Sequence, residues 1–337
     1  MSSDLNRREV LKASAYAGAL GMILGPGSLL RSASAGALQP EFAPSTIGAP
    51  KRAIRLVHMT DMHIQPELKA FEGVTSCLHH MQSLADKPSL ILTGGDLVMD
   101  SLAQDATRTG TLWNLWTKTL KDSCSLPVEH CIGNHDIWGW NKAKSKVTGD
   151  EPKWGKRWAL DVLGLEKPYR TFDKAGWRFI VLDSVFPGPR PDGGYIGKLD
   201  DEQFAWLEGV LNQTPATKPV LVLTHIPILT VTAIAHQSKP TVEKHEVPVA
   251  KMMSDMPRIV KLFEKHRNVK TCLSGHIHDI DEINYQGVKY LCDGAVSGAW
   301  WKGKHDDCQE GYALIDLYED GTVQRTYQTY GWSAAKD

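Results

Sequence analysis

Short apolar runs alternate with longer stretches of helical spacing along the chain from residue 53 onward. The apolar runs are rich in Val, Ile and Leu, which predicts buried β-strands. These runs cover residues 53–60, 89–93, 127–132, 177–183, 219–225 and 269–274. Apolar residues three or four positions apart predict helices between them, at 67–85, 105–121, 153–163, 200–211 and 256–266. Alternating strands and helices are typical of a layered α/β domain.

The last third of the chain has a different pattern. Residues 282–285, 288–292 and 311–328 predict antiparallel hairpins, and Asp320-Gly321 supplies a turn in the last of them. Two long connections, 138–149 and 228–249, each follow a segment that carries candidate site residues. Connections of this length in a compact domain are usually functional lids or disordered excursions, and their position here favours lids.

The first 35 residues have the composition of an export signal. The pair Arg7-Arg8 precedes a weakly apolar stretch at 13–30, and Ala33-Ser34-Ala35 offers a small-residue cleavage site. This arrangement resembles a bacterial twin-arginine signal, cleaved after Ala35, and predicts a periplasmic or secreted protein. The alternative is an uncleaved anchor or an amphipathic start of the fold. We expect the signal at 1–35, a proline-containing linker at 36–52 and one folded domain at 53–337.

Charge narrows the classes of partner. The chain carries 38 basic and 39 acidic residues, a formal net charge of −1. Such a balance provides no electrostatic surface for a nucleic-acid polymer or an acidic membrane. Glycine and proline interrupt the stretch at 13–30, which makes it a poor spanning helix, and we expect no stable membrane insertion once the signal is removed. The oligomeric state stays open.

Six cysteines are present, and the sequence leaves their pairing open. An even number in an oxidising compartment permits disulfides, yet cysteines inside apolar strand-like runs are ordinarily free and buried. No C-x-x-C occurs, which argues against a zinc knuckle. The six are Cys77, Cys124, Cys131, Cys272, Cys292 and Cys308.

Most of the strands predicted between residues 53 and 274 run into residues that can bind a metal. The segments at their ends are Asp61-Met62-His63, Gly94-Gly95-Asp96, Gly133-Asn134-His135-Asp136, Thr224-His225 and Gly275-His276-Ile277-His278. Functional residues of open α/β sheets gather beyond the carboxyl ends of the strands. We therefore expect these side chains to meet at one edge of the domain.

The spacing and the residue types both point to a metal. Residues two apart on an extended segment face the same side, so Asp61 and His63 can bind one ion, and His276 and His278 can face a common centre. Glycine before Asp96, Asn134 and His276 permits a close backbone turn. Carboxylate, imidazole and amide ligands suit manganese, iron or zinc. Each motif alone is common, as a turn or a surface histidine, but the five together in order favour a metal site.

In these five motifs the sequence resembles the calcineurin-like metallophosphoesterase superfamily, whose pattern is D-x-H, G-D, G-N-H-[DE], H and G-H-x-H. The resemblance covers roughly residues 53–320 and implies a four-layered αββα sandwich that carries two metal ions. Carried over, the first ion would be held by Asp61, His63 and His278, the second by Asn134, His225 and His276, with Asp96 bridging both. His135 would be the catalytic residue that contacts the substrate without binding metal.

The resemblance implies hydrolysis of a small-molecule phosphate ester, either a phosphodiester or a phosphomonoester, by a hydroxide that bridges the two metals. The alternative is a non-catalytic metal-binding or ligand-binding protein on the same scaffold. Such a protein would be expected to have lost ligands, and this chain keeps all seven together with His135.

One departure from related sequences and one pair of aromatic residues affect the surroundings of the site. After Gly95-Asp96 the next aspartate is Asp100, one place later than in the Ser/Thr protein phosphatases of the superfamily, so the carboxylate partner of His135 is left open. Near the C-terminus, Trp300 and Trp301 either stack on an aromatic or apolar leaving group or form a buried plug beneath the last hairpin.

Overall fold

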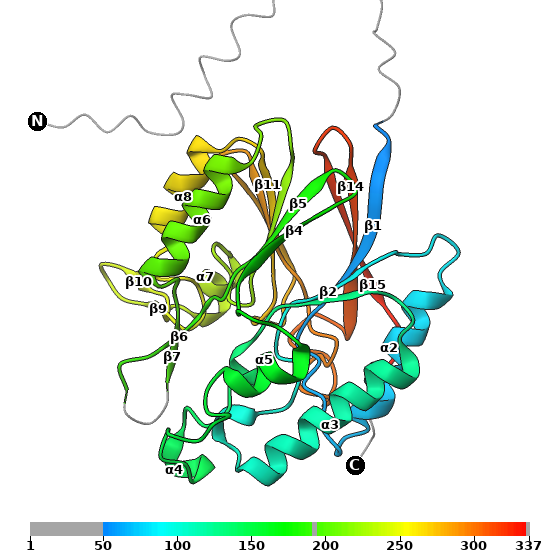
Figure 1. Ribbon diagram of the computed structural model, residues 1–337, viewed down its shortest axis with the longest axis vertical. Helices are drawn as coiled ribbons and strands as arrows, with labels where there is room; N and C mark the ends of the chain where they lie inside the picture. Colours follow the sequence, from blue (N-terminus) through cyan, green and yellow to red (C-terminus); the bar gives the residue numbers. More distant parts are fainter. Residues whose placement is uncertain (1–49, 191–193, 335–337) are drawn as a thin grey trace, which may run out of the picture. The chain divides into compact units, whose positions relative to one another are not determined.

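The structure of the protein, a computed structural model, describes residues 50–190 and 194–334. The expected export signal at 1–35 and most of the expected linker lie outside these residues. The described chain builds two large β-sheets and the helices that cover them (Figure 1). In this part of the chain no helix combines the length and apolarity needed to cross a membrane.

The first sheet combines both ends of the domain. Its parallel strands are β1 (Arg52–Met59), β2 (Ile91–Thr93) and β3 (Val128–His130). The hairpin of β14 (Gly311–Tyr318) and β15 (Val323–Thr329) joins the other side of β1 in antiparallel pairing. Its turn contains the expected Asp320-Gly321, and the φ of 87° at Gly321 explains the glycine. The spatial order is therefore β15-β14-β1-β2-β3.

The second sheet has the order β12-β13-β11-β8-β5-β4. Its centre is parallel, made of β5 (Trp177–Val181), β8 (Val220–Leu223), β11 (Val269–Ser274) and β13 (Val288–Cys292). The edge strands β4 (Arg170–Lys174) and β12 (Asp281–Tyr285) pair antiparallel with their neighbours. The parallel strands of both sheets end in the loops that carry the candidate residues.

The core lies between the two sheets and beneath the helices. Leu56 of β1 and Leu221 of β8 share one buried cluster with residues of both sheets, which is the layer between them. Their neighbours Val57 and Val222 belong to a second cluster that includes Phe263 and other helix residues. Because successive strand residues face opposite sides, every position of the central strands β2 and β8 is buried in one layer or the other. Each such side chain contributes about 1.5–3 kcal/mol of burial.

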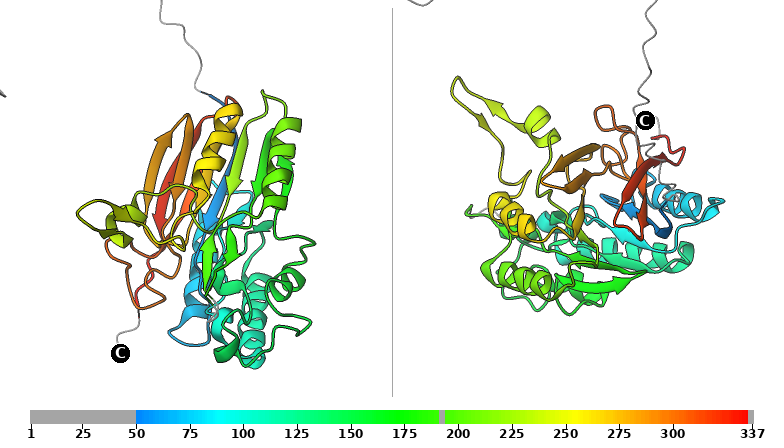
Figure 2. Two further views of the ribbon diagram at one scale, coloured as in Figure 1. Left: turned by 90° about the vertical axis from the view of Figure 1, so that its left-hand side faces the viewer. Right: turned by 90° about the horizontal axis from the view of Figure 1, so that it is seen from above.

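Helices cover the outer face of each sheet (Figures 1 and 2). On the first sheet, α2 (Ala70–Ser83) contacts β14 through His80 and Tyr312, and α3 (Ala106–Ser123) contacts β3 through Trp116. On the second sheet lie α6 (Asp201–Gln213) and α8 (Met256–Lys265). The side chains of Asp105 and Asp200 cap the first turns of α3 and α6. The architecture is the expected four-layered αββα sandwich.

The elements expected from the pattern are present, and the differences lie at the periphery. The helix expected at 153–163 begins only at α5 (Arg157–Leu163), and the half-buried, polar β4 was not expected. The connection at 138–149 contains α4 (Lys142–Ser145). The connection at 228–249 contains α7 (Thr232–Gln237) and the short hairpin of β9 (Lys239–Pro240) and β10 (His245–Glu246). A further short pair, β6 (Val185–Pro187) and β7 (Tyr195–Gly197), follows β5.

Candidate metal centre

Both sheets deliver the eight candidate residues to one end of the domain. The first sheet supplies those that follow β1, β2 and β3, and the second supplies those that follow β8 and β11. The contacts described below join the five segments directly. Seven of the residues are buried, and we refer to them as the buried centre: Asp61, His63, Asp96, Asn134, His225, His276 and His278. His135, at their edge, keeps 22% of its side chain exposed.

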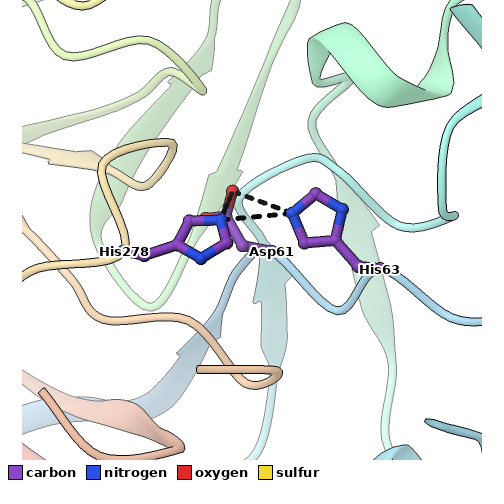
Figure 3. Close-up of side chains that lie close together, drawn as sticks. All are labelled: Asp61, His63 and His278. Carbon is purple, nitrogen blue, oxygen red and sulfur yellow. Dashed lines mark hydrogen bonds and ion pairs between the residues drawn. The ribbon is translucent and has the colours of Figure 1, made fainter. Parts of the chain in front are cut away.

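Asp61, His63 and His278 form the first group of the buried centre (Figure 3). The Nε2 atoms of His63 and His278 lie 3.1 Å apart, and Asp61 Oδ1 is 3.3 Å from His278 Nε2 and 3.8 Å from His63 Nε2. Two residues come from the first sheet and one from the second, so this group exists only because the two sheets pack together. It corresponds to the first ligand set that the sequence suggested.

Asp96, His225 and His276 form the second group. Here His225 Nε2 lies 3.1 Å from His276 Nδ1, 3.1 Å from Asn134 Oδ1 and 3.3 Å from Asp96 Oδ2. The same Asp96 Oδ2 is 3.7 Å from His63 Nε2 of the first group. The carboxylate of Asp96 thus lies between the groups, where a bridging ligand is expected.

Backbone carbonyls orient the histidines of the buried centre. A ring nitrogen of each of three histidines donates to a backbone carbonyl. His225 donates to Gly94 at 2.8 Å, His276 to Ala250 at 2.8 Å and His278 to Gly298 at 2.6 Å. In the neutral rings the other nitrogen then carries a lone pair, and in each case that nitrogen faces the centre. Carbonyl acceptors behind imidazole ligands are the arrangement that fixes metal-binding histidines.

The carboxylate of Asp61 supports the same conclusion. Its Oδ2 accepts hydrogen bonds from Thr60 Oγ1 at 2.6 Å and from the amide of His276 at 2.9 Å. Its Oδ1 is buried and has no hydrogen-bond partner, although it faces His63 and His278. An unsatisfied buried carboxylate oxygen beside imidazole lone pairs is costly unless a cation lies between them. The donor set therefore fits divalent metal ions.

The protonation of the histidines in the protein without metal is consistent with binding of divalent metal ions. Burial lowers the pKa of His63 and of His276, so both rings are neutral donors. Burial also lowers the pKa of His225, but the charges of Asp96 and Asp61 outweigh it and raise it to about 9. A bound cation would replace that proton, which is the usual exchange on metal binding.

The backbone at the centre departs from the extended conformation that the spacing suggested. β1 ends at Met59, and beyond it Asp61 and His63 have φ values of 56° and 43°. Asp96, His276 and His278 also lie in the left-handed region, which costs about 1–2 kcal/mol for a residue with a side chain. The loop after β2 stabilises the turns at Asp61 and His63, because their backbone amides donate to the backbone carbonyls of Gly95 and Asp96. Asp61 and His63 therefore point to a common position, as expected, but they do so from strained turns rather than from an extended strand.

Glycines permit the close approach of these loops. A Cβ at Gly133 would lie 2.2 Å from Asp96 Oδ1, and a Cβ at Gly275 would lie 2.0 Å from Thr60 Oγ1 and 2.3 Å from Asp61 Oδ2. No side chain fits at either position without displacing a residue of the buried centre. The expectation that glycine serves a close turn before Asn134 and His276 is confirmed by these distances.

Asp136 braces the loops, a role that the sequence did not suggest. Its Oδ1 accepts the amides of Leu97 and Val98, and its Oδ2 accepts the amide of Gly133. Burial and the nearby charge of Asp96 raise the pKa of Asp136 to about 7. The side chain ties the second motif to the third, and its place at the end of G-N-H-D was the available signal.

His135 lies against the centre with a carboxylate behind it. Its Nε2 is 3.9 Å from Asp96 Oδ2, and its Nδ1 is 3.3 Å from Asp100 Oδ1. Burial lowers the pKa of His135, but the carboxylates of Asp96 and Asp100 outweigh burial and raise it to about 9. The partner left open by the sequence is thus Asp100. Its left-handed conformation, with φ of 66°, accommodates the extra residue in the motif.

The two adjacent tryptophans have different environments. Trp301 is buried, and its indole N–H lies 3.0 Å from the carbonyl of Met62 and 3.1 Å from that of His63. Trp300 keeps 37% of its surface exposed, and its ring lies 4.7 Å from that of His278. The plug interpretation therefore describes Trp301, and Trp300 lies at the edge of the centre.

Two further residues at the edge were missed because nothing in their local sequence marks them. The ring of Tyr195, on β7, lies 5.9 Å from that of His276. Lys251 follows Ala250, whose carbonyl accepts from His276, and burial lowers the pKa of Lys251 against the charges of Asp61 and Asp96. We call His135, Tyr195, Lys251 and Trp300 the rim. The rim comes from loops and short strands whose positions only the folded chain defines.

The model of the calcineurin-like phosphoesterase family matches residues 54–279, which include every residue of the buried centre. The chain belongs to the calcineurin-like phosphoesterase family. The match begins in β1 and ends directly after His278, so it includes strands of both sheets and all five motifs, while β12 to β15 lie beyond it.

Similar proteins agree with this assignment. This phosphoesterase is 24% identical over 243 residues to a probable glycerophosphodiester phosphodiesterase of Arcobacter nitrofigilis, covering 70% of this chain and 76% of the relative. It is 21% identical over 291 residues to a 3',5'-cyclic adenosine monophosphate phosphodiesterase of Vibrio vulnificus, covering 82% and 90%. A dimetal phosphatase from Danio rerio shares the fold, with a TM-score of 0.56, 14% identity and coverage of 83% and 97%.

The chain is therefore a hydrolase of phosphate esters. The alternative of a non-catalytic metal-binding or ligand-binding protein is not favoured, because the Asp and His groups that can hold metal are assembled and all relatives reported above are phosphoesterases. Family membership and donor chemistry together indicate divalent metal ions as cofactors.

Proposed function

We propose that this phosphoesterase is an exported phosphodiesterase of small molecules that works with two divalent cations. The observation that carries the proposal is the convergence of ring nitrogens and carboxylate oxygens on two adjacent groups, which Asp96 links. Asp61, His63 and His278 would hold one cation, Asn134, His225 and His276 the other, and Asp96 both. Manganese, iron and zinc suit this donor set.

Bound cations would supply Lewis-acid chemistry, which polarises the phosphoryl group and lowers the pKa of water. The protein residues perform the remaining steps. Without bound cations, the carboxylates of Asp96 and Asp100 outweigh burial and raise the pKa of His135 to about 9, so that its ring carries a proton at neutral pH. With Nδ1 directed at Asp100, its Nε2 is free to donate that proton to the leaving oxygen of the ester. Asp100 keeps the ring in this orientation.

The identities of relatives support a diester as the substrate. Both curated relatives described above are phosphodiesterases by name, one for a glycerol ester and one for a cyclic nucleotide. Small molecules are favoured over nucleic-acid polymers because the net charge of −1 gives the chain no basic excess to bind a polyanion.

Metal content and hydrolysis measured on one preparation test the proposal. The purified chain is loaded with manganese, its bound metal is counted, and bis-p-nitrophenyl phosphate is compared with p-nitrophenyl phosphate. About two metals per chain and faster turnover of the diester are expected. Faster turnover of the monoester would mean that the protein is a phosphatase rather than a phosphodiesterase. A chain that binds no metal would overturn the two-cation proposal.

Export through the twin-arginine route is the second part of the proposal, supported by Arg7-Arg8 and Ala33-Ser34-Ala35. All six cysteines of the chain lie among the described residues and are free, so the fold needs no oxidising compartment and can form before export. Replacing Arg7 and Arg8 by lysine should retain the protein in the cytoplasm of a bacterial host. Equal periplasmic amounts of both forms would exclude this route.

A further inference from the structure

Trp300 and Trp301 are consecutive residues in the left-handed region, with φ values of 53° and 70°. Non-glycine residues adopt this conformation at a cost, and bulky ones rarely do so twice in succession. The turn that holds them is therefore determined by its surroundings. What it achieves is a separation of two neighbouring indoles, one directed into the core and one toward the edge of the metal centre.

The segment that contains these tryptophans is fastened to the first group of the buried centre. Ser297 donates its hydroxyl to the carbonyl of Asp61 at 2.7 Å, and Val296 donates its amide to that of Thr60 at 3.0 Å. The carbonyl of Gly298 in the same segment accepts from His278 Nδ1. A displacement of this segment would thus disturb Asp61 and His278 together.

Trp301 anchors the turn. Its indole fills the space above Gly73, where a Cβ would lie 2.1 Å from the ring, and it packs edge-on against Trp332 at 5.5 Å. This ring is buried, and its N–H is bonded to the loop that carries His63. Trp300, the preceding residue of the same turn, lies outside the core with 37% of its surface exposed.

Trp300 lies over the histidines of the first group. Its ring is 4.7 Å from that of His278 at an interplanar angle of 41°, and 6.1 Å from that of His63. His305 flanks it at 6.0 Å, fixed by an Nδ1 contact of 3.2 Å with Asp279. In the described part of the chain, Trp300 is the only tryptophan among the large apolar residues that remain exposed. An exposed aromatic ring so close to a reactive centre is suited to contact the substrate.

We propose that Trp300 forms a stacking surface for a planar aromatic group of the phosphate ester. This inference rests on the proposed function and deepens it, because it names the substrate class as aromatic esters. A phosphoryl group at the centre would lie beside His63 and His278, and its substituent on that side would meet the indole of Trp300. Every aromatic group has a face that can stack there, and His278 and His305 complete an aromatic wall.

The other edge of the centre does not offer this chemistry. Beside His276 lies the half-buried ring of Tyr195, and Lys251 follows Ala250, whose carbonyl accepts from His276 Nε2 at 2.8 Å. Their polar groups suit phosphoryl oxygens, whereas Trp300 offers a bare ring face. The two edges together orient the ester, with its aromatic substituent on the side of the first group.

Binding of paired ligands to the manganese-loaded full chain tests the stacking surface. Phenylphosphonate and methylphosphonate share the headgroup and differ only in the ring, and their dissociation constants are measured by calorimetry. Wild type should prefer phenylphosphonate, and Trp300→Leu should reduce that preference about tenfold. Because leucine, like tryptophan, carries a side chain, the substitution leaves the conformational cost of the left-handed backbone unchanged. Tyr285→Leu, which removes an exposed aromatic ring at the end of β12 that points away from the site loops, is the matched control.

A second pair separates the two sources of an aromatic group. The affinities of adenosine 5'-monophosphate and ribose 5-phosphate are compared to detect stacking of a base that is separated from phosphorus by a sugar. The phenylphosphonate pair instead detects stacking of a ring that is bonded directly to phosphorus. A Trp300-dependent preference in either pair supports the stacking surface and assigns the distance. Equal affinities within both pairs, in a protein that hydrolyses bis-p-nitrophenyl phosphate, overturn it. A Trp300-dependent preference without hydrolysis of any ester keeps the surface and overturns the proposed function instead.

Discussion

The buried centre and the rim occupy the same end of the domain but are built differently. Asp61 and His278 of the centre are buried, follow strands directly and are fixed by hydrogen bonds to backbone groups. Trp300 and His135 of the rim are partly exposed and follow turns whose course depends on other loops. Five residues of the centre pay the cost of a left-handed backbone, and Trp300 is the only rim residue that does so.

This difference indicates that the buried centre determines the chemistry and the rim determines the selectivity for the ester. The centre needs a fixed geometry, because metal ligands must converge within narrow distances. It obtains this from two sheets that are packed on one another and from glycines that admit no Cβ. The rim needs shape and charge suited to one ester, and loops can change these without disturbing the sheets. Substitutions at the two regions should therefore affect different quantities.

Removing a ligand should have the largest effect. Asp61→Asn replaces the carboxylate that faces both His63 and His278, and loss of several kcal/mol of transition-state stabilisation reduces turnover roughly 10³-fold or more. Metal content should fall with it. The measurement is kcat/KM for bis-p-nitrophenyl phosphate together with metal analysis of the purified variant. A variant with full metal content and turnover would show that Asp61 is no part of the centre.

Removing the rim histidine should separate catalysis from metal binding. His135→Ala should lower kcat about 10²–10⁴-fold, the usual contribution of general acid–base catalysis, while both metals stay bound. Asp100→Asn should cost only about tenfold, through loss of one charge-assisted contact. Since Asp100 raises the pKa of His135, its removal should also move the alkaline limb of kcat/KM to lower pH. Loss of metal in His135→Ala would contradict the assignment.

The adjacent tryptophans allow a direct comparison of stability. Trp301→Ala should lower the free energy of unfolding by about 3–5 kcal/mol, as for other buried aromatic residues. Trp300→Ala should change it by less than about 1 kcal/mol, because its ring is partly solvated. Denaturant unfolding of the two variants checks the difference. Equal losses would mean that Trp300 is a core residue, which would remove the structural basis of a stacking surface.

The smallest expected effect compares two glycines. Gly275→Ala places a methyl group against Thr60 and Asp61 and should cost about 1–3 kcal/mol of stability, with weakened metal binding. Gly209→Ala is the matched control, since nothing lies within 4 Å of its Cβ position in α6. It should stabilise the protein by about 0.5–1 kcal/mol. Thermal unfolding with and without manganese measures both, and a tolerated Gly275→Ala would show that the loops can separate.

Sequence reasoning recovered most of the fold because apolar periodicity is a local property. β11 was expected at 269–274 and spans Val269–Ser274, whereas β4 was missed because its residues are half-buried and polar. The eight candidate residues that it named meet at one end of the domain because each comes after a strand within a short motif. It missed Asp136, Tyr195 and Lys251, and left the partner of His135 open, because those roles depend on contacts between segments that are distant in sequence.

By itself, the sequence determined the layered α/β class and the residue types of the centre, since hydrophobic spacing and strand-end motifs are both written along the chain. Tertiary structure decided how those residues meet. Only the packing of the two sheets places His278 3.1 Å from His63, and only the folded turn places Trp301 in the core and Trp300 beside His278. The physical reason is that a distance between side chains from separate loops depends on the whole set of packed layers, which no local pattern encodes.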